Sequence, residues 1–196
     1  MLQASLMLAC SVILFSGCST STNMHTQTVP DKDYREALQQ TDPGNYVLPK
    51  DGSDEEAAML RPFRELFETY TYENVEANLP IVYADKLYFR DAFKQFSEVE
   101  PLLNYMLKGF EPLENSEFLI NRIINKDGEY YVDWMMRLDF KKTPTGTWEE
   151  SIGMTHIRFN SEGEVIFHQD YWDPTDIVYR RIPIAKQLIG YVKKKL

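Results

Sequence analysis

Cysteine, histidine and basic charge are all scarce in this 196-residue chain. Both of its cysteines lie before residue 19, so the folded part has neither a disulfide framework nor a cysteine-based zinc site. With three histidines in all, a metal site would need mostly carboxylate ligands, and we expect no metal and no other cofactor. The net charge of −9 argues against a nucleic-acid partner, because phosphates require a basic face.

Hydrophobic and aromatic residues, by contrast, are plentiful. They make up 43% and 13% of the chain, with 12 Tyr, 11 Phe and 3 Trp. This composition is typical of one globular domain that has a large core or an aromatic-lined cavity.

The first 17 residues carry no charge and include an apolar run, Leu6 to Phe15, that is too short to span a bilayer. The small residues before Cys18 resemble the lipobox of bacterial lipoproteins. This resemblance implies that residues 1–17 are removed as a signal peptide and that Cys18 is lipidated. The alternatives are an ordinary secretory signal or a short anchor. Because Ser19 stands where a retention signal has aspartate, we expect a cell-envelope protein on the outer membrane, facing the periplasm.

Composition divides the rest of the chain into three parts. Residues 18–52 are polar and rich in turn residues, and we expect a lipidated flexible tether, in which a short helix from Tyr34 to Gln40 is possible. Residues 53–175 carry the periodic patterns of a folded domain. Residues 176–196 read as a basic amphipathic helix, which Asp173 and Pro174 would begin; it either packs on the domain or contacts anionic lipid in the membrane.

Helical spacing comes first in the domain, and period-two spacing follows. Capping boxes at Ser53–Glu56 and Ser97–Glu100 predict helix starts, and another helix is expected over residues 74–83. A short strand is expected over residues 86–90, and turn residues separate four further strands expected over 116–125, 129–141, 147–160 and 164–173. Sequential hairpins predict an α+β fold with a curved antiparallel sheet.

Two segments resemble the nuclear transport factor 2-like superfamily, which includes SnoaL-like cyclases, ketosteroid isomerases and limonene epoxide hydrolases. They are Tyr83–Asp91, after the expected second helix, and His156–Asp173, which resembles the last two strands. The resemblance implies a cone-shaped sheet wrapped around N-terminal helices, with a pocket at its open end. It also implies a possible homodimer through the sheet.

In this superfamily the position of Asp91 points into the pocket, where ketosteroid isomerases have their general base. The alternative for Asp91 is a cap on the loop after a strand. The proton-donating aspartate of those isomerases aligns with Thr155, which cannot stabilise an enolate in that way. We therefore do not expect steroid isomerisation.

The resemblance to epoxide hydrolases rests on Asp133 and on the run Asp170-Tyr171-Trp172-Asp173. Two carboxylates in one dry pocket can act as an acid and a base. Tyr131 replaces the arginine that bridges them in those enzymes, which weakens the analogy. The strand register is also open: burial favours Tyr130, Val132 and Trp134 inward, whereas the analogy favours Asp133 inward.

Period-two geometry places His168, Asp170 and Trp172 on one face, which the family alignment makes the pocket face. His168 and Asp170 would be either an acid–base pair or a buried pair that orients the last strand. As candidate catalytic residues we take Asp91, His168 and Asp170, and as pocket-lining residues Tyr88, Asp133, Thr155 and Trp172.

Three functions remain open at this point. The first is capture of a small apolar or lipid-like ligand, which the incomplete catalytic sets favour. The second is a hydrolase, lyase or isomerase that uses the pocket carboxylates and His168. The third is a protein–protein interaction module.

Overall fold

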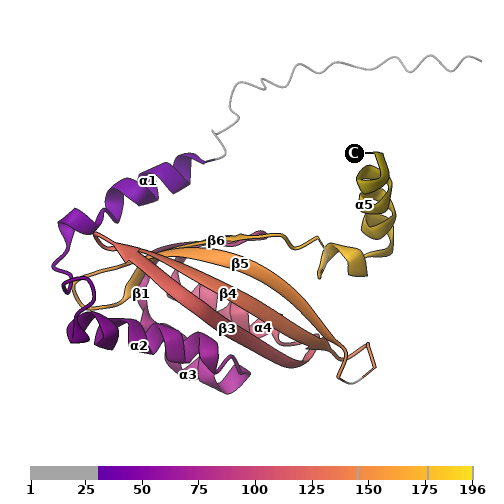
Figure 1. The fold of residues 1–196 in the computed structure, drawn as a ribbon, viewed down its shortest axis with the longest axis horizontal. Coiled ribbons are helices and arrows are strands. Elements are labelled where there is room, and N and C mark those ends of the chain that lie inside the picture. The colour runs from indigo at the N-terminus through magenta and orange to yellow at the C-terminus, as the bar shows by residue number, and fades with distance from the viewer. Residues whose placement is uncertain (1–30, 145, 176, 196) are drawn as a thin grey trace, which may run out of the picture. The chain divides into compact units, whose positions relative to one another are not determined.

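The computed structural model describes residues 31–144, 146–175 and 177–195. The chain divides into a unit of residues 1–32, described only from residue 31, and a folded unit of residues 33–196. The signal peptide and Cys18 lie outside the described residues. Everything below concerns the folded unit (Figure 1).

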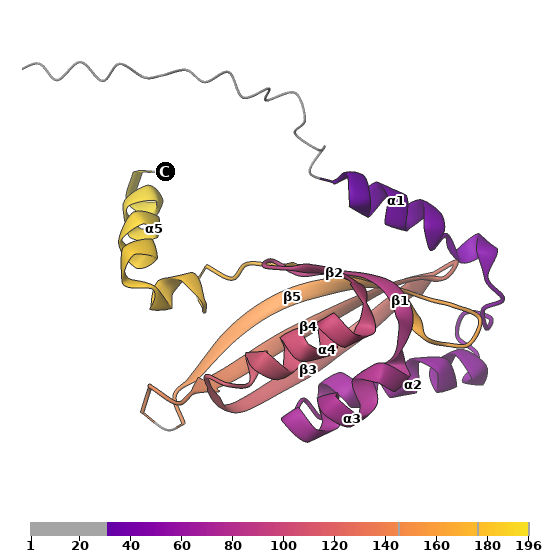
Figure 2. The ribbon, with the colours of Figure 1, turned by 180° about the vertical axis from the view of Figure 1, so that it is seen from behind.

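Three helices lie on one face of the sheet, as Figures 1 and 2 show together. They are α2 (Asp54–Glu68), α3 (Tyr72–Val82) and α4 (Val99–Gly109). The capping box at the start of α2 is present, since the Glu56 amide donates to Ser53 Oγ and the Glu56 carboxylate accepts from the Gly52 amide. The second expected box is wrong, because Ser97 lies in a strand and α4 begins without a side-chain cap.

Six strands form one curved, mixed sheet in the order β2-β1-β6-β5-β4-β3. Their bounds are β1 Tyr83–Arg90, β2 Gln95–Glu98, β3 Leu113–Lys126, β4 Glu129–Phe140, β5 Trp148–Phe159 and β6 Val165–Trp172. The four long strands from β3 to β6 are the antiparallel meander that the turn residues predict. The expectation of a wholly antiparallel sheet is wrong at one place, because β6 runs parallel to β1.

The strand register follows hydrophobic burial. Along β4, alternate residues from Tyr130 to Leu138 are buried on the helix side, whereas Tyr131 and Asp133 lie on the opposite face. The apolar face therefore points toward α2 and α4, where it removes the largest area from water. We call the helix side the inner face of the sheet and the opposite side the outer face.

The segment expected to be a flexible tether is folded in part. Residues 32–40 form helix α1, and its residue Ala37 is buried with Tyr88 and Phe167 of the outer face. Arg158 of β5 donates to the Leu38 carbonyl at 2.7 Å. The helix considered possible from Tyr34 to Gln40 is therefore present. The prediction of a flexible tether is wrong for this helix, because its apolar residues pack on the sheet.

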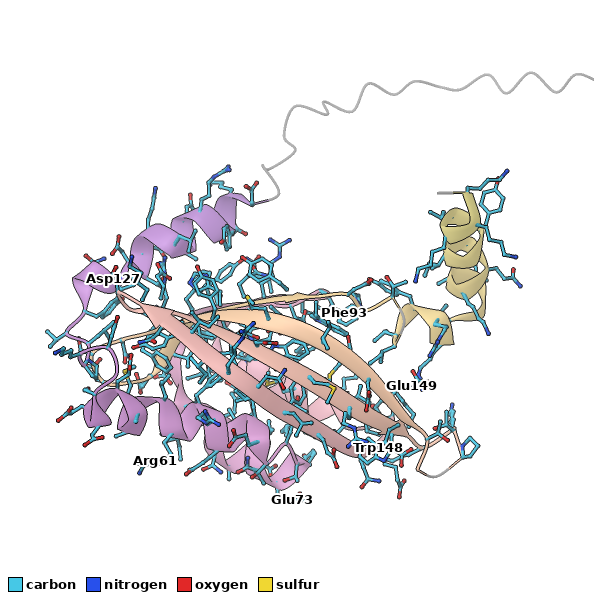
Figure 3. All side chains as sticks on the ribbon, viewed as in Figure 1. Arg61, Glu73, Phe93, Asp127, Trp148 and Glu149 are labelled. Carbon is cyan, nitrogen blue, oxygen red and sulfur yellow. The ribbon has the colours of Figure 1, made fainter. Side chains whose placement is uncertain are left out.

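The C-terminal helix starts later than the sequence predicts. Asp173 accepts a hydrogen bond from the Thr175 amide in a turn, but helix α5 covers Pro183–Lys195. Before it, Arg181 pairs with Glu149 of β5 at 2.6 Å; Figure 3 labels Glu149. Among the described residues, no helix is both long enough and apolar enough to cross a membrane.

Candidate functional site

A cavity of about 460 Å³ lies between the inner face of the sheet and the helices. Ten aromatic side chains line it: Phe63, Phe67, Tyr70, Phe89, Phe93, Tyr105, Phe118, Trp134, Phe140 and Trp172. Its ionisable lining residues are Asp91, Lys108, His168 and Asp170, together with the tyrosines. Phe93, in the loop after β1, and Lys108, near the end of α4, are exposed and belong to its rim (Figure 3 labels Phe93).

A chain of hydrogen bonds centres on Asp170 of β6. Its Oδ1 accepts from the Thr155 hydroxyl and from Nε2 of His168, which is 3.0 Å away. The other nitrogen of His168, Nδ1, lies 2.9 Å from the Tyr83 hydroxyl. Thr155 Oγ1 in turn accepts from the Trp134 indole at 2.8 Å. Two donors, Thr155 and His168, therefore hold Oδ1 in place, and Trp134 and Tyr83 hold those two donors in turn. Oδ2 accepts no hydrogen bond from any described residue.

Asp91 is the second polar group of the cavity. It fills both positions considered from the sequence, because it caps the loop after β1 and also lines the pocket. Its Oδ1 accepts from the backbone amides of Phe93 and Lys94, each at 2.7 Å, and so caps the loop. Its Oδ2 accepts from the Tyr105 hydroxyl of α4 at 2.6 Å and lines the cavity. The loop cap thus fixes a carboxylate at the cavity wall.

The tyrosines beside these carboxylates remain protonated. Burial raises the pKa of Tyr70, and the charges of Asp170 and Asp91 raise it further. Burial, the hydrogen bond to Asp91 and the nearby negative charges raise the pKa of Tyr105 as well. Burial also raises the pKa of Tyr83. These hydroxyls are therefore hydrogen-bond donors at neutral pH.

No protein-family model matches the sequence, and no curated protein matches it. Solved structures do match. A protein of unknown function from Burkholderia pseudomallei, described as nuclear transport factor 2-like, has a TM-score of 0.53 at 9% identity over 61% of this chain and 94% of its own. A ketosteroid isomerase-like protein from Catenulispora acidiphila, solved with trimethylamine, has 0.51 at 13% identity over 61% and 88%. A SnoaL-like polyketide cyclase from Jannaschia, itself a tentative assignment, has 0.50 at 13% identity over 66% and 94%.

The folded unit has the nuclear transport factor 2-like fold. At 9–13% identity the match establishes the fold alone, so the chemistry has to come from the cavity.

The cavity contains five of the seven residues that the sequence singles out: Asp91, Thr155, His168, Asp170 and Trp172. His168 and Asp170 form a direct hydrogen bond, with Nε2 3.0 Å from Oδ1. Their shared face follows from strand periodicity alone.

The other two predicted pocket residues lie on the outer face. Tyr88 stacks on Phe167 under α1, with ring centroids 5.0 Å apart. Asp133 pairs with Arg122 at 3.1 Å on the outer face. Both assignments to the pocket are wrong, because each residue alternates with inward apolar neighbours, and burial of those neighbours turns it outward. The carboxylate pair of the epoxide hydrolase analogy is therefore not assembled.

Sequence reasoning missed two tyrosines of the cavity: Tyr70, in the connection between α2 and α3, and Tyr105 of α4. Only the packing of α4 across the end of β1 brings Tyr105 to Asp91, fourteen positions away. The sequence did indicate that Trp134 faces the cavity, since the register favoured by burial places its side chain inward. A buried indole N–H needs an acceptor, which the structure supplies as Thr155 of β5, the cross-strand partner of Val132.

Proposed function

We propose that this protein binds a small, mainly apolar molecule in the cavity of its folded unit. The observation that carries the proposal is the cavity itself, about 460 Å³ with ten aromatic lining side chains inside one domain. Ligand pockets are typically of this size and are mostly apolar with a few placed polar groups. A cavity with so much aromatic surface gains free energy when an apolar ligand displaces its water.

The polar groups would orient the ligand. Asp170 lines the cavity and its Oδ2 accepts no hydrogen bond from any described residue, and Tyr70 lines the same cavity. A ligand with one polar end and an apolar body satisfies both parts of the lining.

Fluorescence of N-phenyl-1-naphthylamine, which rises in apolar surroundings, tests the proposal. Met136→Trp should lower probe affinity at least tenfold, because Met136 lines the cavity and a larger side chain fills it. Met135→Trp is the matched control, since Met135 is on the outer face and should leave affinity unchanged. Equal binding by both variants would contradict a ligand site in the cavity. Native mass spectrometry of protein purified from its own envelope would identify a ligand that copurifies.

Acid–base catalysis is the second candidate, and the arrangement of Asp170 favours it. Asp170 lines the cavity, and its Oδ2, which accepts no hydrogen bond from any described residue, can accept a proton. His168 supports the carboxylate through Oδ1, and Tyr83 contacts His168. His168 itself has both ring nitrogens engaged, so Asp170 would make the transfer. A hydrolase, lyase or isomerase would convert the copurified compound, and Asp170→Asn would abolish the conversion while it leaves binding measurable.

The place of action in this proposal is the bacterial cell envelope. The lipobox-like run before Cys18 supports a lipid anchor on the outer membrane, facing the periplasm. Helix α5 supports a second contact with anionic lipid, because Ile184, Leu188 and Tyr191 are exposed beside its basic residues.

A further inference from the structure

The two cavity carboxylates have few positive charges around them. The donors to Asp91 are two backbone amides and the Tyr105 hydroxyl, which are all neutral. Among the described residues, no lysine or arginine is within ion-pair distance of Asp91 or Asp170. Lys108 lines the rim, but it is exposed and belongs to the solvent side.

Among the described residues, His168 is the one basic side chain that contacts Asp170, and its other ring nitrogen lies beside the Tyr83 hydroxyl. The Tyr83 hydroxyl stays protonated and can donate to Nδ1, so that Nε2–H donates to Asp170. In this arrangement the ring donates one hydrogen bond to Asp170, and no lysine or arginine of the described residues adds an ion pair. Asp91 and Asp170 together then give the cavity two negative charges.

Uncompensated carboxylates next to apolar walls are costly, and a ligand that brings a positive charge removes that cost. The walls favour the same ligand, because aromatic faces attract cations within about 6 Å of the ring centroid. Asp91 and Asp170 line the same cavity as Tyr70 and Tyr105. The negative charges of both carboxylates contribute to the raised pKa of each tyrosine.

We infer that the ligand carries a cationic ammonium group on its mainly apolar body. This inference rests on the proposed function and adds the charge of the ligand to it. The cation would lie against Asp170 Oδ2, with Asp91 and the aromatic rings around it.

Two probes of nearly equal shape distinguish the effect of ligand charge on affinity from the effect of ligand size. Tyramine and 4-propylphenol differ only in an ammonium group in place of a methyl group, and each can displace N-phenyl-1-naphthylamine from the full-length protein. At pH 8, histidine is mostly neutral and tyramine is cationic. We expect tyramine to bind at least tenfold more tightly than 4-propylphenol.

Removal of either cavity charge should remove this preference. Asp170→Asn and Asp91→Asn should each lower the ratio of tyramine affinity to 4-propylphenol affinity at least tenfold. Asp133→Asn is the matched control, because it removes the same charge from the outer face. Its tyramine affinity should equal that of the wild type.

Each other outcome has one meaning. Tighter or equal binding of 4-propylphenol by the wild type overturns the ammonium inference and leaves the apolar ligand site intact. A preference for tyramine that survives in both cavity variants also overturns it, because the cation is then recognised elsewhere. If N-phenyl-1-naphthylamine does not bind at all, the proposed function itself fails. The wild-type comparison stands even if a variant does not fold.

Discussion

Gly153 is the residue whose missing side chain lets Trp134 reach Thr155. A Cβ at position 153 would lie 2.3 Å from Cζ2 of Trp134, well inside van der Waals contact. The two residues are cross-strand partners on β5 and β4, so neither backbone can withdraw without breaking the ladder. Glycine here therefore protects the hydrogen-bond chain that ends at Asp170.

Gly153→Ala should accordingly destabilise the protein by about 1–3 kcal/mol, the usual cost of overpacking a core. It should also displace the Trp134 indole and shift its fluorescence. Urea unfolding measures the first effect and emission spectra the second. Gly109→Ala is the control, because a Cβ there meets nothing within 4 Å. A Gly153→Ala protein as stable as Gly109→Ala would show that the ring moves freely.

At the scale of elements, a charged cluster joins α1 to the sheet. Glu129 of β4 accepts from His156 and Arg158 of β5, and Arg158 also donates to the Leu38 carbonyl of α1. Burial raises the pKa of Glu129, but the hydrogen bonds from Arg158 and His156 outweigh it and lower the pKa below 4.5. Burial also lowers the pKa of His156 below 6.5.

Both shifts give stability the same dependence on pH. A group whose pKa is lower in the folded protein binds more protons when the protein unfolds, so stability falls as pH falls. The loss should begin near pH 6.5 with His156 and continue below pH 4.5 with Glu129. Each proton contributes at most about 1.4 kcal/mol per pH unit.

Melting temperatures between pH 5 and 8 check this expectation. His156→Gln should flatten the curve below pH 6.5, because the titrating ring is gone. His25→Gln makes the same exchange outside the described residues and should keep the wild-type slope. If the His156→Gln slope equals that of the wild type, another group controls the acid response.

Across the whole molecule, charge is divided between the domain and its C-terminus. Residues 174–196 hold six basic residues and one acid, a net charge of +5, which leaves −14 for the rest of the chain. An anionic membrane repels the acidic body and attracts the basic tail. With lipid on Cys18, the protein would then have two attachments of different chemistry.

Salt extraction of cell membrane fractions should distinguish the lipid attachment at Cys18 from the electrostatic attachment through α5. Palmitate should label the wild-type protein and not Cys18→Ala. At low salt, Cys18→Ala should stay partly bound through α5, and 0.5 M salt should release it, because salt screens charge but not an acyl chain. Substitution of Lys193, Lys194 and Lys195 by Gln on the same background should release it at low salt.

The control for the whole-molecule prediction is the triple Lys→Gln variant with Cys18 intact. It should remain in the membrane fraction at both salt concentrations, held by its lipid. Palmitate labelling of Cys18→Ala, or its retention at high salt, would rule out lipidation at this position.

Local patterns in the sequence determined the elements and the pairing of His168 with Asp170. Capping at Ser53, turns at Gly128 and Gly163, and period-two alternation depend on neighbours a few residues away. The two glycines have φ of 83°, a conformation that suits glycine and closes the hairpins as expected. For the same reason, His168 and Asp170 could be placed on one face of one strand.

The tertiary structure alone decided what lies opposite these elements. Burial of Val132 and Trp134 sent Asp133 outward, the packing of α4 brought Tyr105 to Asp91, and α1 covered Tyr88. These outcomes depend on which surfaces of the helices and the sheet pack together. The favoured packing is the one that buries the most apolar area of the whole chain. A carboxylate at a strand end or a tyrosine on a helix has no such partner in its own segment, so no local pattern could assign one.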